Sequence, residues 1–347
     1  GDMKVTGLPE LKIIRDDYLA KLNAYKYHIL VCGGAGCVSS GCQDVEKALL
    51  AALEQHGLRD QALVLETGCI GTCAVGPVML IEPDGVFYTK LTPDSAKEIV
   101  QAHLVNGEIL KQYTFYDHSL RKHVPKIEDI NFFREQVKIA LRNCGAMEHA
   151  RIEAYIARDG YQAAAKALTG MTGADVVNEI KASGLMGRGG AGFPTGVKWE
   201  AGLKAPGPIK YIVCNADEGD PGAFMDRSII EGDPHSVVEG MLIGGYAIGA
   251  HLGYVYVRAE YPLAIARLEK ALEQAREMGL LGKDIFGSGF DFDIEIRIGA
   301  GAFVCGEETA LMNSIEGERG EPRQKPPFPF QNGLFGKPTI INNVMSF

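Results

Sequence analysis

Two close pairs of cysteines, each directly after a β-rich run, constrain this chain more than any other feature. The pairs have the spacings C-x4-C and C-x3-C, and they are Cys32 with Cys37 and Cys69 with Cys73. In an open α/β sheet the loops that follow the strands converge at one edge, so we expect the four thiols to meet there. Glycines fill most of the first loop and can turn backbone N–H groups towards the thiols. The sequence therefore predicts a sulfur-rich site at the edge of a small α/β domain.

Four converging thiolates are ligands for zinc or for an iron–sulfur cluster. Zinc ribbons usually space each pair C-x2-C, and this chain does not. A [2Fe–2S] cluster takes two cysteines per iron and accepts N–H donors at its sulfides, so the spacing favours the cluster, with zinc and a redox-active thiol set as alternatives. We interpret Cys42 as a helix-start residue, with a spare thiol and a substitute ligand as alternatives. Three solitary cysteines are expected outside the site, namely Cys144, Cys214 and Cys305.

Length and charge limit the class of protein. The 347 residues suffice for two to three domains, and 35 Lys and Arg against 44 Asp and Glu give a net charge of −9. No block of basic residues stands out, so nucleic acid is not an expected partner. Glycines interrupt the apolar stretch 240–257, which we interpret as helix, turn and strand rather than a membrane span. No export signal is visible at the N-terminus, and we expect a cytoplasmic protein.

Residues 25–110 resemble the thioredoxin-like [2Fe–2S] ferredoxin domain that accompanies flavoprotein subunits of NADH-oxidising complexes. The cysteine spacing and the Gly-rich first loop carry this resemblance. It implies that the metal ligands are Cys32, Cys37, Cys69 and Cys73. The rest of the pattern predicts a helix after the first pair and a final helix that opens at Thr92.

Two stretches beside this domain are predicted to be helical. Residues 1–24 are expected to form an N-terminal helical segment, and residues 111–183 a helical connector. Within the connector, helices are predicted at 160–168 and 172–180, the second with Thr172 as its N-cap. The histidines of the connector lack an i, i+4 partner, so no metal site is expected there.

A second unusual segment lies at 184–196, where six of thirteen residues are glycine. Backbone this bare can lie flat against a ring or a phosphate, and Arg188 and its neighbours add charge and an aromatic face. The pattern Gly187-x-Gly189-x-x-Gly192 matches the dinucleotide fingerprint by letter only, because a predicted helix precedes it. We interpret the segment as a ligand cradle rather than a flexible hinge.

Two further loops follow predicted strands and carry acidic side chains. The strand 210–214 leads into 215–222, which holds an amide and three carboxylates. A divalent-metal site and a site for nucleotide hydroxyls both fit such a loop, and nearby basic side chains favour the second. The strand 294–298 leads into 299–309, whose glutamates lie at a predicted helix N-terminus.

Residues 184–344 closely resemble the flavoprotein subunits of NADH dehydrogenases, a family that includes the NADH-binding subunit of respiratory complex I and NAD-reducing formate dehydrogenases and hydrogenases. The resemblance implies a Rossmann-like α/β domain over 184–347 that binds FMN and NAD(H). The implied FMN residues are Gly187, Arg188, Gly190, Lys198, Asn215, Asp217, Gly306, Glu307, Asn342 and Asn343. The implied NADH residues are Gly190, Ala191, Phe193, Lys198, Asp220, Phe303 and Glu308. Gly189 and Glu218 complete the predicted cofactor-binding set.

The chain departs from this family in four places. Met186 stands where relatives usually have Arg, a change that we expect to be tolerated. Ala201 stands where many relatives have an aromatic side chain against adenine, and this bears on NADH affinity. Asp220 is one methylene shorter than the Glu of the complex I branch, but its charge is still expected to favour NADH over NADPH. Relatives continue beyond Phe347, so we expect a piece of a longer protein, with a [4Fe–4S] cluster only in the missing part.

These resemblances imply an NADH dehydrogenase (diaphorase) flavoprotein subunit. It would pass a hydride between NAD(H) and FMN, and single electrons to iron–sulfur subunits of a larger soluble complex. The fused ferredoxin domain suggests a hydrogenase complex, including electron-bifurcating [FeFe] hydrogenases, with a formate dehydrogenase or complex I-like subunit as the alternative. Hydride transfer needs no protein acid or base, so no catalytic residue is predicted. Hypotheses of other classes are a non-catalytic scaffold and a thiol-redox or zinc module joined to a nucleotide sensor.

Overall fold

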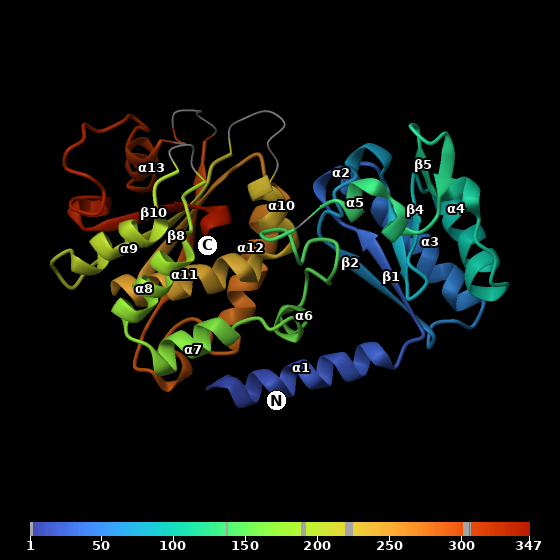
Figure 1. Ribbon diagram of the computed structural model, residues 1–347, viewed down its shortest axis with the longest axis horizontal. Coiled ribbons are helices and arrows are strands. Elements are labelled where there is room, and N and C mark those ends of the chain that lie inside the picture. Colours follow the sequence, from blue (N-terminus) through green and yellow to red (C-terminus); the bar gives the residue numbers. More distant parts are fainter. Residues whose placement is uncertain (1–2, 137, 189–191, 219–224, 301–304, 306) are drawn as a thin grey trace. The chain divides into compact units, whose positions relative to one another are not determined.

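A computed structural model gives the fold of the chain (Figure 1). It describes residues 3–136, 138–188, 192–218, 225–300, 305 and 307–347. The chain divides into two compact units, which we name by their content. The cysteine unit comprises residues 16–154 and 231–233, and the pocket unit comprises 1–15, 155–230 and 234–347. The division predicted from the sequence, at residues 24, 110 and 183, stays a prediction.

The described residues of the cysteine unit form a four-stranded mixed sheet in the order β2-β1-β3-β4. Strands β1 and β2 run parallel, and the antiparallel hairpin of β3 and β4 lies on the other side of β1. The strands are β1 Tyr27–Cys32, β2 Ala62–Thr67, β3 Met79–Glu82 and β4 Val86–Tyr88. The helices are α2 Ala35–Ser39, α3 Cys42–Gln55, α4 Pro93–Ile99 and α5 Asn131–Arg134.

Helical spacing of apolar residues explains why α3 packs on this sheet. Val45, Leu49 and Leu53 lie on one face of the helix, and all three are buried. The predicted final helix is α4, and its N-cap is confirmed, because the Thr92 hydroxyl accepts the backbone N–H of Ser95. The parallel pairing of β1 with β2 brings together the loops that follow them.

The predicted helical connector contains a hairpin that the sequence did not indicate. Residues Phe115–Asp117 (β5) pair with Lys122–Val124 (β6). The Asp117 carboxylate accepts the backbone N–H groups of Ser119 and Leu120 and so closes the turn. A turn made by one side chain leaves no trace in hydrophobic periodicity, which is why composition alone suggested helix.

The described residues of the pocket unit form a parallel four-stranded sheet in the order β10-β7-β8-β9. The strands are β7 Tyr211–Ala216, β8 Leu252–Arg258, β9 Asp293–Gly299 and β10 Thr339–Asn343. The helices are α7 Gln162–Gly170, α8 Gly173–Ser183, α9 Thr195–Lys204, α11 Pro234–Ile248, α12 Pro262–Glu277 and α13 Glu308–Ile315. Three more helices cross unit boundaries, namely α1 Leu8–Asn23, α6 Ile152–Ala157 and α10 Met225–Gly232.

Several sequence-based expectations for this unit are confirmed. The strands predicted at 210–214 and 294–298 correspond to β7 and β9, and the stretch 240–257 contains the end of α11, a turn and most of β8. The N-cap at Thr172 is present, since its hydroxyl accepts the N–H of Asp175. Helix α8 precedes the Gly-rich segment, whereas a dinucleotide fingerprint would follow a strand.

A buried histidine links α7 and α12 to α11. His235 Nδ1 lies 2.6 Å from Tyr161 Oη, and its Nε2 lies 3.0 Å from Gln274 Oε1. The amide oxygen of Gln274 can only accept, so Nε2 carries the proton, and Tyr161 donates to Nδ1. Burial disfavours the charged ring and lowers the pKa of His235 to about 4.

The pocket unit is expected to lose stability between about pH 6.5 and about pH 4. In this window His235 is protonated in the unfolded chain but neutral in the folded unit. The free energy of unfolding therefore falls as pH falls, by about 3 kcal/mol for this group. Fluorescence of Trp199, the single tryptophan, measures urea unfolding of this unit. His235→Asn should flatten the pH profile, and the exposed His118→Asn should leave it unchanged. An unchanged profile in His235→Asn would contradict the assignment.

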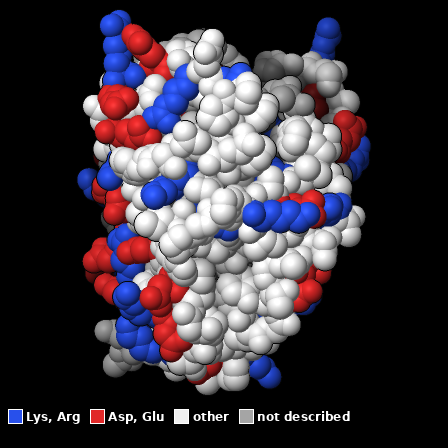
Figure 2. Space-filling view, turned by 90° about the vertical axis from the view of Figure 1, so that its left-hand side faces the viewer, with Lys and Arg blue, Asp and Glu red and all other residues white. Residues whose placement is uncertain are grey.

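Among the described residues, no helix is both long enough and apolar enough to cross a lipid bilayer. Figure 2 shows the face that lies to the left in Figure 1. Uncharged residues cover most of the middle of that face, while Lys and Arg mix with Asp and Glu along one side. Because both signs occur together, the visible surface has no extended patch of one charge.

Candidate functional site

The four cysteines predicted as ligands are neighbours at one edge of the cysteine-unit sheet. Cys32 is the last residue of β1, and Cys69 follows β2. The sulfur atoms of Cys69 and Cys73 are 3.7 Å apart. Contact with the Cys37 thiol raises the pKa of Cys32 to about 12, and Cys32 also contacts Cys69. Parallel pairing of two strands thus brings together thiols that lie more than thirty residues apart in sequence.

Bare backbone surrounds these thiols. A Cβ atom on Gly34 would lie 2.9 Å from the Cβ of Cys69, and one on Gly76 would lie 2.9 Å from the sulfur of Cys37. Any side chain at these positions would collide with the sulfur ligands. Glycine at these two positions therefore lets the backbone approach the cysteines closely.

The donor set suits a binuclear cluster. A [2Fe–2S] cluster takes two thiolates at each of two irons, and these loops bring together two pairs of cysteines. Cys42 is buried at the first residue of α3, in agreement with its interpretation as a helix-start residue.

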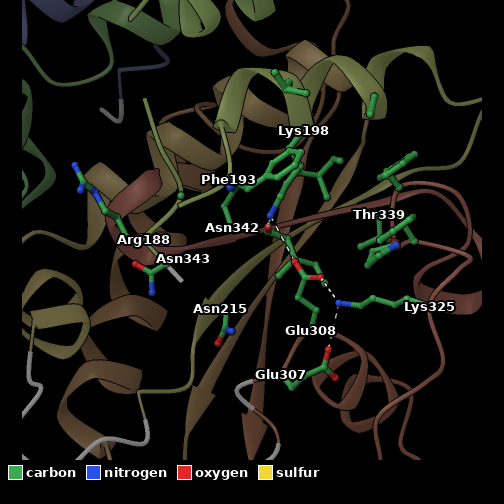
Figure 3. A pocket seen from close by; sticks show the side chains of 18 of the residues that line it. Arg188, Phe193, Lys198, Asn215, Glu307, Glu308, Lys325, Thr339, Asn342 and Asn343 are labelled. Atoms are coloured by element: carbon green, nitrogen blue, oxygen red, sulfur yellow. Dashed lines mark hydrogen bonds and ion pairs between the residues drawn. The ribbon is translucent and has the colours of Figure 1, made fainter. Parts of the chain in front are cut away.

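A pocket of about 730 Å³ opens in the pocket unit, beside the C-terminal ends of β7 and β10 (Figure 3). Its volume is in the usual range for a cofactor site. Nine residues of the predicted set line it, namely Gly187, Arg188, Phe193, Lys198, Asn215, Glu307, Glu308, Asn342 and Asn343. The fold therefore gathers most of the predicted cofactor residues that the structure describes.

Two described stretches of the Gly-rich segment, 184–188 and 192–196, contribute residues to the lining of this pocket. The two stretches pair, since the N–H of Gly187 donates to the carbonyl of Phe193 at 2.7 Å, and the N–H of Thr195 donates to Leu185 at 2.9 Å. The pairing fixes Arg188 in one stretch and Phe193 in the other. Phe193 is 51% exposed, so an aromatic face is open to a ligand.

Four charged side chains form a chain of ion pairs along the pocket, drawn as dashed lines in Figure 3. Lys198 Nζ lies 3.5 Å from Glu308 Oε1, and Lys325 Nζ lies 3.0 Å from Glu308 Oε2 and 3.3 Å from Glu307 Oε1. Lys198 also donates to the carbonyl of Ile341 at 2.6 Å. Two cations are thus held in place beside the cavity.

Glu307 is the N-cap of α13, as its predicted place at a helix N-terminus requires. Its Oε2 accepts the N–H groups of Thr309 at 2.9 Å and Ala310 at 3.1 Å. Burial acts to raise the pKa of Glu307, but these hydrogen bonds and the charge of Lys325 outweigh it and lower the pKa. The carboxylate therefore stays ionised beside the cavity.

The two asparagines at the end of β10 are fixed by neighbours from other elements. The indole N–H of Trp199 in α9 donates to Asn342 Oδ1 at 2.9 Å. The side-chain amide of Asn343 donates to Asp226 Oδ2 at 2.9 Å. Asn343 also pairs in register with Asn215 of β7, so two amides stand side by side at the strand ends.

Two predicted residues lie near this pocket but outside its lining. The side chain of Asp217 is 4% exposed and lies 3.7 Å from Arg258 Nε. Burial raises the pKa of Asp217, and it raises that of Glu218 to about 7. Glu218 Oε2 accepts the N–H of Asp226 at 3.0 Å. In this structure Asp217 pairs with β8 and Glu218 with the start of α10, and neither carboxylate lines the pocket.

Six predicted cofactor residues lie outside the described residues, and they are Gly189, Gly190, Ala191, Asp220, Phe303 and Gly306. The structure adds lining residues that the sequence did not single out. Lys325 completes the ion-pair chain, and the stacked rings of Phe328 and Phe330, 5.8 Å apart at 2°, form an aromatic wall. The two aromatic residues flank a proline, and that short pattern was the available signal.

Two known families match separate parts of this chain. Residues 180–347 match the family described as the Nuo51 FMN-binding domain, and residues 20–104 match the thioredoxin-like [2Fe-2S] ferredoxin family. The two matched stretches do not overlap. The family resemblance, the mixed α/β fold class and the cofactor pair FMN and [2Fe–2S] predicted from the sequence are confirmed.

Several curated proteins are similar to parts of this chain. The HndC component of the NADP-reducing hydrogenase of Solidesulfovibrio fructosivorans is 65% identical over 62% of this chain and 43% of its own length. A subunit of the NADH-quinone oxidoreductase of Aquifex aeolicus is 54% identical over 56% of this chain and 45% of its own. The alpha subunit of the NAD-reducing hydrogenase HoxS of Cupriavidus necator is 38% identical over 93% of this chain and 52% of its own.

One solved structure is similar over nearly the whole chain. The NAD⁺-reducing [NiFe]-hydrogenase in the H2-reduced state matches 99% of this chain and 60% of its own, with 25% identity and a TM-score of 0.50. The chain spans about half the length of the curated relatives described above. These relatives are subunits of multi-subunit complexes by their names.

Proposed function

We propose that this chain is the NADH-oxidising part of a diaphorase subunit in a larger redox complex such as a hydrogenase. The observation that carries the proposal is the pocket at the ends of β7 and β10, with two fixed lysines, in one chain with four converging thiols. FMN, when bound, accepts the hydride of NADH and passes electrons on one at a time. Cys32, Cys37, Cys69 and Cys73 are the proposed ligands of the [2Fe–2S] cluster.

The residues of the pocket unit would bind and orient rather than transfer protons. Lys198 and Lys325 present positive charge to the phosphates of a nucleotide while Glu307 and Glu308 hold both lysines in place. The amides of Asn215, Asn342 and Asn343 supply donors and acceptors for the edge of a flavin ring. The exposed ring of Phe193 offers a stacking surface. The six predicted residues outside the described part of the chain belong to the same proposal.

Partners and compartment follow from the same chemistry. Electrons leaving the flavin singly need other iron–sulfur centres, so we propose iron–sulfur subunits as partners, in keeping with the names of the relatives. Thiolate ligands require reduced cysteines, which supports the cytoplasm as the compartment. The relatives include both NADP-reducing and NAD-reducing enzymes, so the preference for NADH that we predict from Asp220 has to be measured.

The test is anaerobic reconstitution of the full chain with FMN, iron and sulfide, followed by NADH or NADPH. We expect NADH to bleach the flavin absorbance and to elicit, as dithionite does, the EPR signal of a one-electron-reduced [2Fe–2S] cluster. Bleaching by NADPH alone would contradict the predicted nucleotide preference. An oxidised flavin under NADH, with no cluster signal under dithionite, would reject the diaphorase in favour of a non-catalytic scaffold.

A further inference from the structure

Two glutamates of the cysteine unit contact each other beside the proposed cluster site. Glu46 of α3 makes a side-chain hydrogen bond with Glu66 of β2. Two carboxylates can hydrogen-bond to each other only if one of them is protonated. Burial, the hydrogen bond and the charge of Glu66 together raise the pKa of Glu46 to about 7. The pair therefore changes its charge near neutral pH.

This pair lies directly against the first ligand loop. Gly33 follows Cys32, and a Cβ atom on Gly33 would lie 2.5 Å from Glu66 Cγ and 2.7 Å from Glu66 Oε1. Glu66 also comes just before the second ligand loop, since β2 ends at Thr67 and Cys69 follows. The Glu46–Glu66 pair thus lies beside both loops that hold the thiols.

A histidine extends the pair on its other side. His149 Nε2 lies 2.8 Å from Glu66 Oε1, and the backbone N–H of His149 donates to the carbonyl of Glu66 at 3.2 Å. Among the described residues, the buried His149 Nδ1 has no hydrogen-bond partner. The Glu46, Glu66 and His149 side chains form a continuous hydrogen-bonded series, which can accept or release a proton.

Other ionisable groups face this series or the same loops. Glu148 pairs through its backbone with Thr67 of β2, and its carboxylate contacts Tyr18 at 3.2 Å and Arg151 at 3.8 Å. The backbone N–H of Ala35 donates to the buried Glu231 at 3.3 Å. Asn143 donates to the buried Asp233 at 2.8 Å. These charges contribute to the field at the loops, but Glu66 is the acidic partner that contacts Glu46.

We propose that the Glu46–Glu66 pair is a redox-linked proton site, which binds one proton from water when the cluster gains one electron. The inference rests on the proposed ligation of a [2Fe–2S] cluster by Cys32, Cys37, Cys69 and Cys73. The electron comes from NADH through the flavin, or from dithionite in the test. The electron adds negative charge beside the loops, which makes a second ionised carboxylate less favourable. The glutamate pair therefore binds this proton more tightly when the cluster is reduced.

Linkage fixes the sign of the effect. Because reduction favours the protonated pair, protonation favours reduction to the same extent. The midpoint potential is therefore constant at low pH, where the pair is already protonated in both states. Above the pKa of the pair in the oxidised state, each pH unit lowers the equilibrium constant for reduction by up to tenfold. The midpoint potential therefore falls there by up to about 59 mV per pH unit for one electron. It becomes constant again once both states are ionised.

The experiment is a redox titration of the reconstituted full chain, followed by the EPR signal of the cluster, at several values from about pH 6 to about pH 9. The wild-type potential should fall with pH across the upper part of this range. Glu46→Gln should abolish most of that slope, because the pair can no longer ionise twice. Glu54→Gln is the matched control, an exposed glutamate of the same helix, and should keep the wild-type slope.

A second measurement needs no variant. The infrared difference between reduced and oxidised wild-type chain at about pH 8 should show a protonated carboxyl band that grows on reduction and shifts in D2O. A potential independent of pH, an unchanged slope in Glu46→Gln, or no carboxyl band would each overturn the inference while leaving the cluster ligands in place. Absence of any cluster signal would instead overturn the proposed function, and this inference with it.

Discussion

Replacing Cys37 by alanine is expected to remove the [2Fe–2S] centre from the reconstituted chain. Cys37 is buried and contacts Cys32, and it is one of the four proposed ligands. One iron would be left with a single thiolate, which does not hold the cluster. The visible absorption and the EPR signal should vanish, and the iron content should fall to background.

The matched control is Cys42→Ala, which removes a buried thiol of the same domain that begins α3. It should keep iron, sulfide and EPR signal at wild-type levels. FMN binding should be unchanged in both variants, because all pocket residues belong to the other unit. A cluster that persists in Cys37→Ala, or that is lost in Cys42→Ala, would show that the ligand set is wrong.

Replacing Lys198 by methionine is expected to weaken binding of FMN by about 10- to 100-fold. The Nζ atom contacts Glu308 and the carbonyl of Ile341, and its removal deletes a fixed cation from the pocket. Hydrogen bonds to charged groups contribute about 1.5–3 kcal/mol, and this corresponds to that range of dissociation constants. Quenching of flavin fluorescence on titration with the chain measures the affinity directly.

Lys204→Met provides the control for that measurement. Lys204 lies on the same helix, its side chain is 73% exposed, and it pairs with Glu200 rather than with the pocket. We expect its flavin affinity to equal that of the wild type. Equal affinities in all three proteins would mean that Lys198 does not contact the flavin, and would remove it from the proposed site.

The carboxyl ends of the strands could be predicted from the sequence because unusual residues stand there. Cys32 and Asn215 stand where apolar β-rich runs stop, and polar or sulfur-bearing residues after a buried run mark the functional edge of a parallel sheet. Convergence of the two cysteine pairs follows from that rule alone. The N-caps at Thr92 and Thr172 were equally local and could be predicted for the same reason.

What the sequence could not supply is the set of long-range partners. Nothing near Trp199 in the chain indicates that its indole N–H donates to Asn342, and nothing near Lys325 indicates that it completes a series of ion pairs with Glu308. Such pairs depend on which strand lies beside which, and the order β10-β7-β8-β9 puts the last strand next to the first. The contact between Glu46 and Glu66 arises in the same way, from a helix packed on a strand.

The position of β10 in its sheet also determines when a growing polypeptide can acquire its flavin. Residues 16–154 supply nearly the whole cysteine unit, and they leave the ribosome as one continuous stretch. The pocket combines residues from Gly187 to Asn343, and its lining includes β10, which pairs with β7. Since domains fold as their residues emerge, the iron–sulfur site can mature early, whereas the flavin site has to wait until synthesis has passed residue 343.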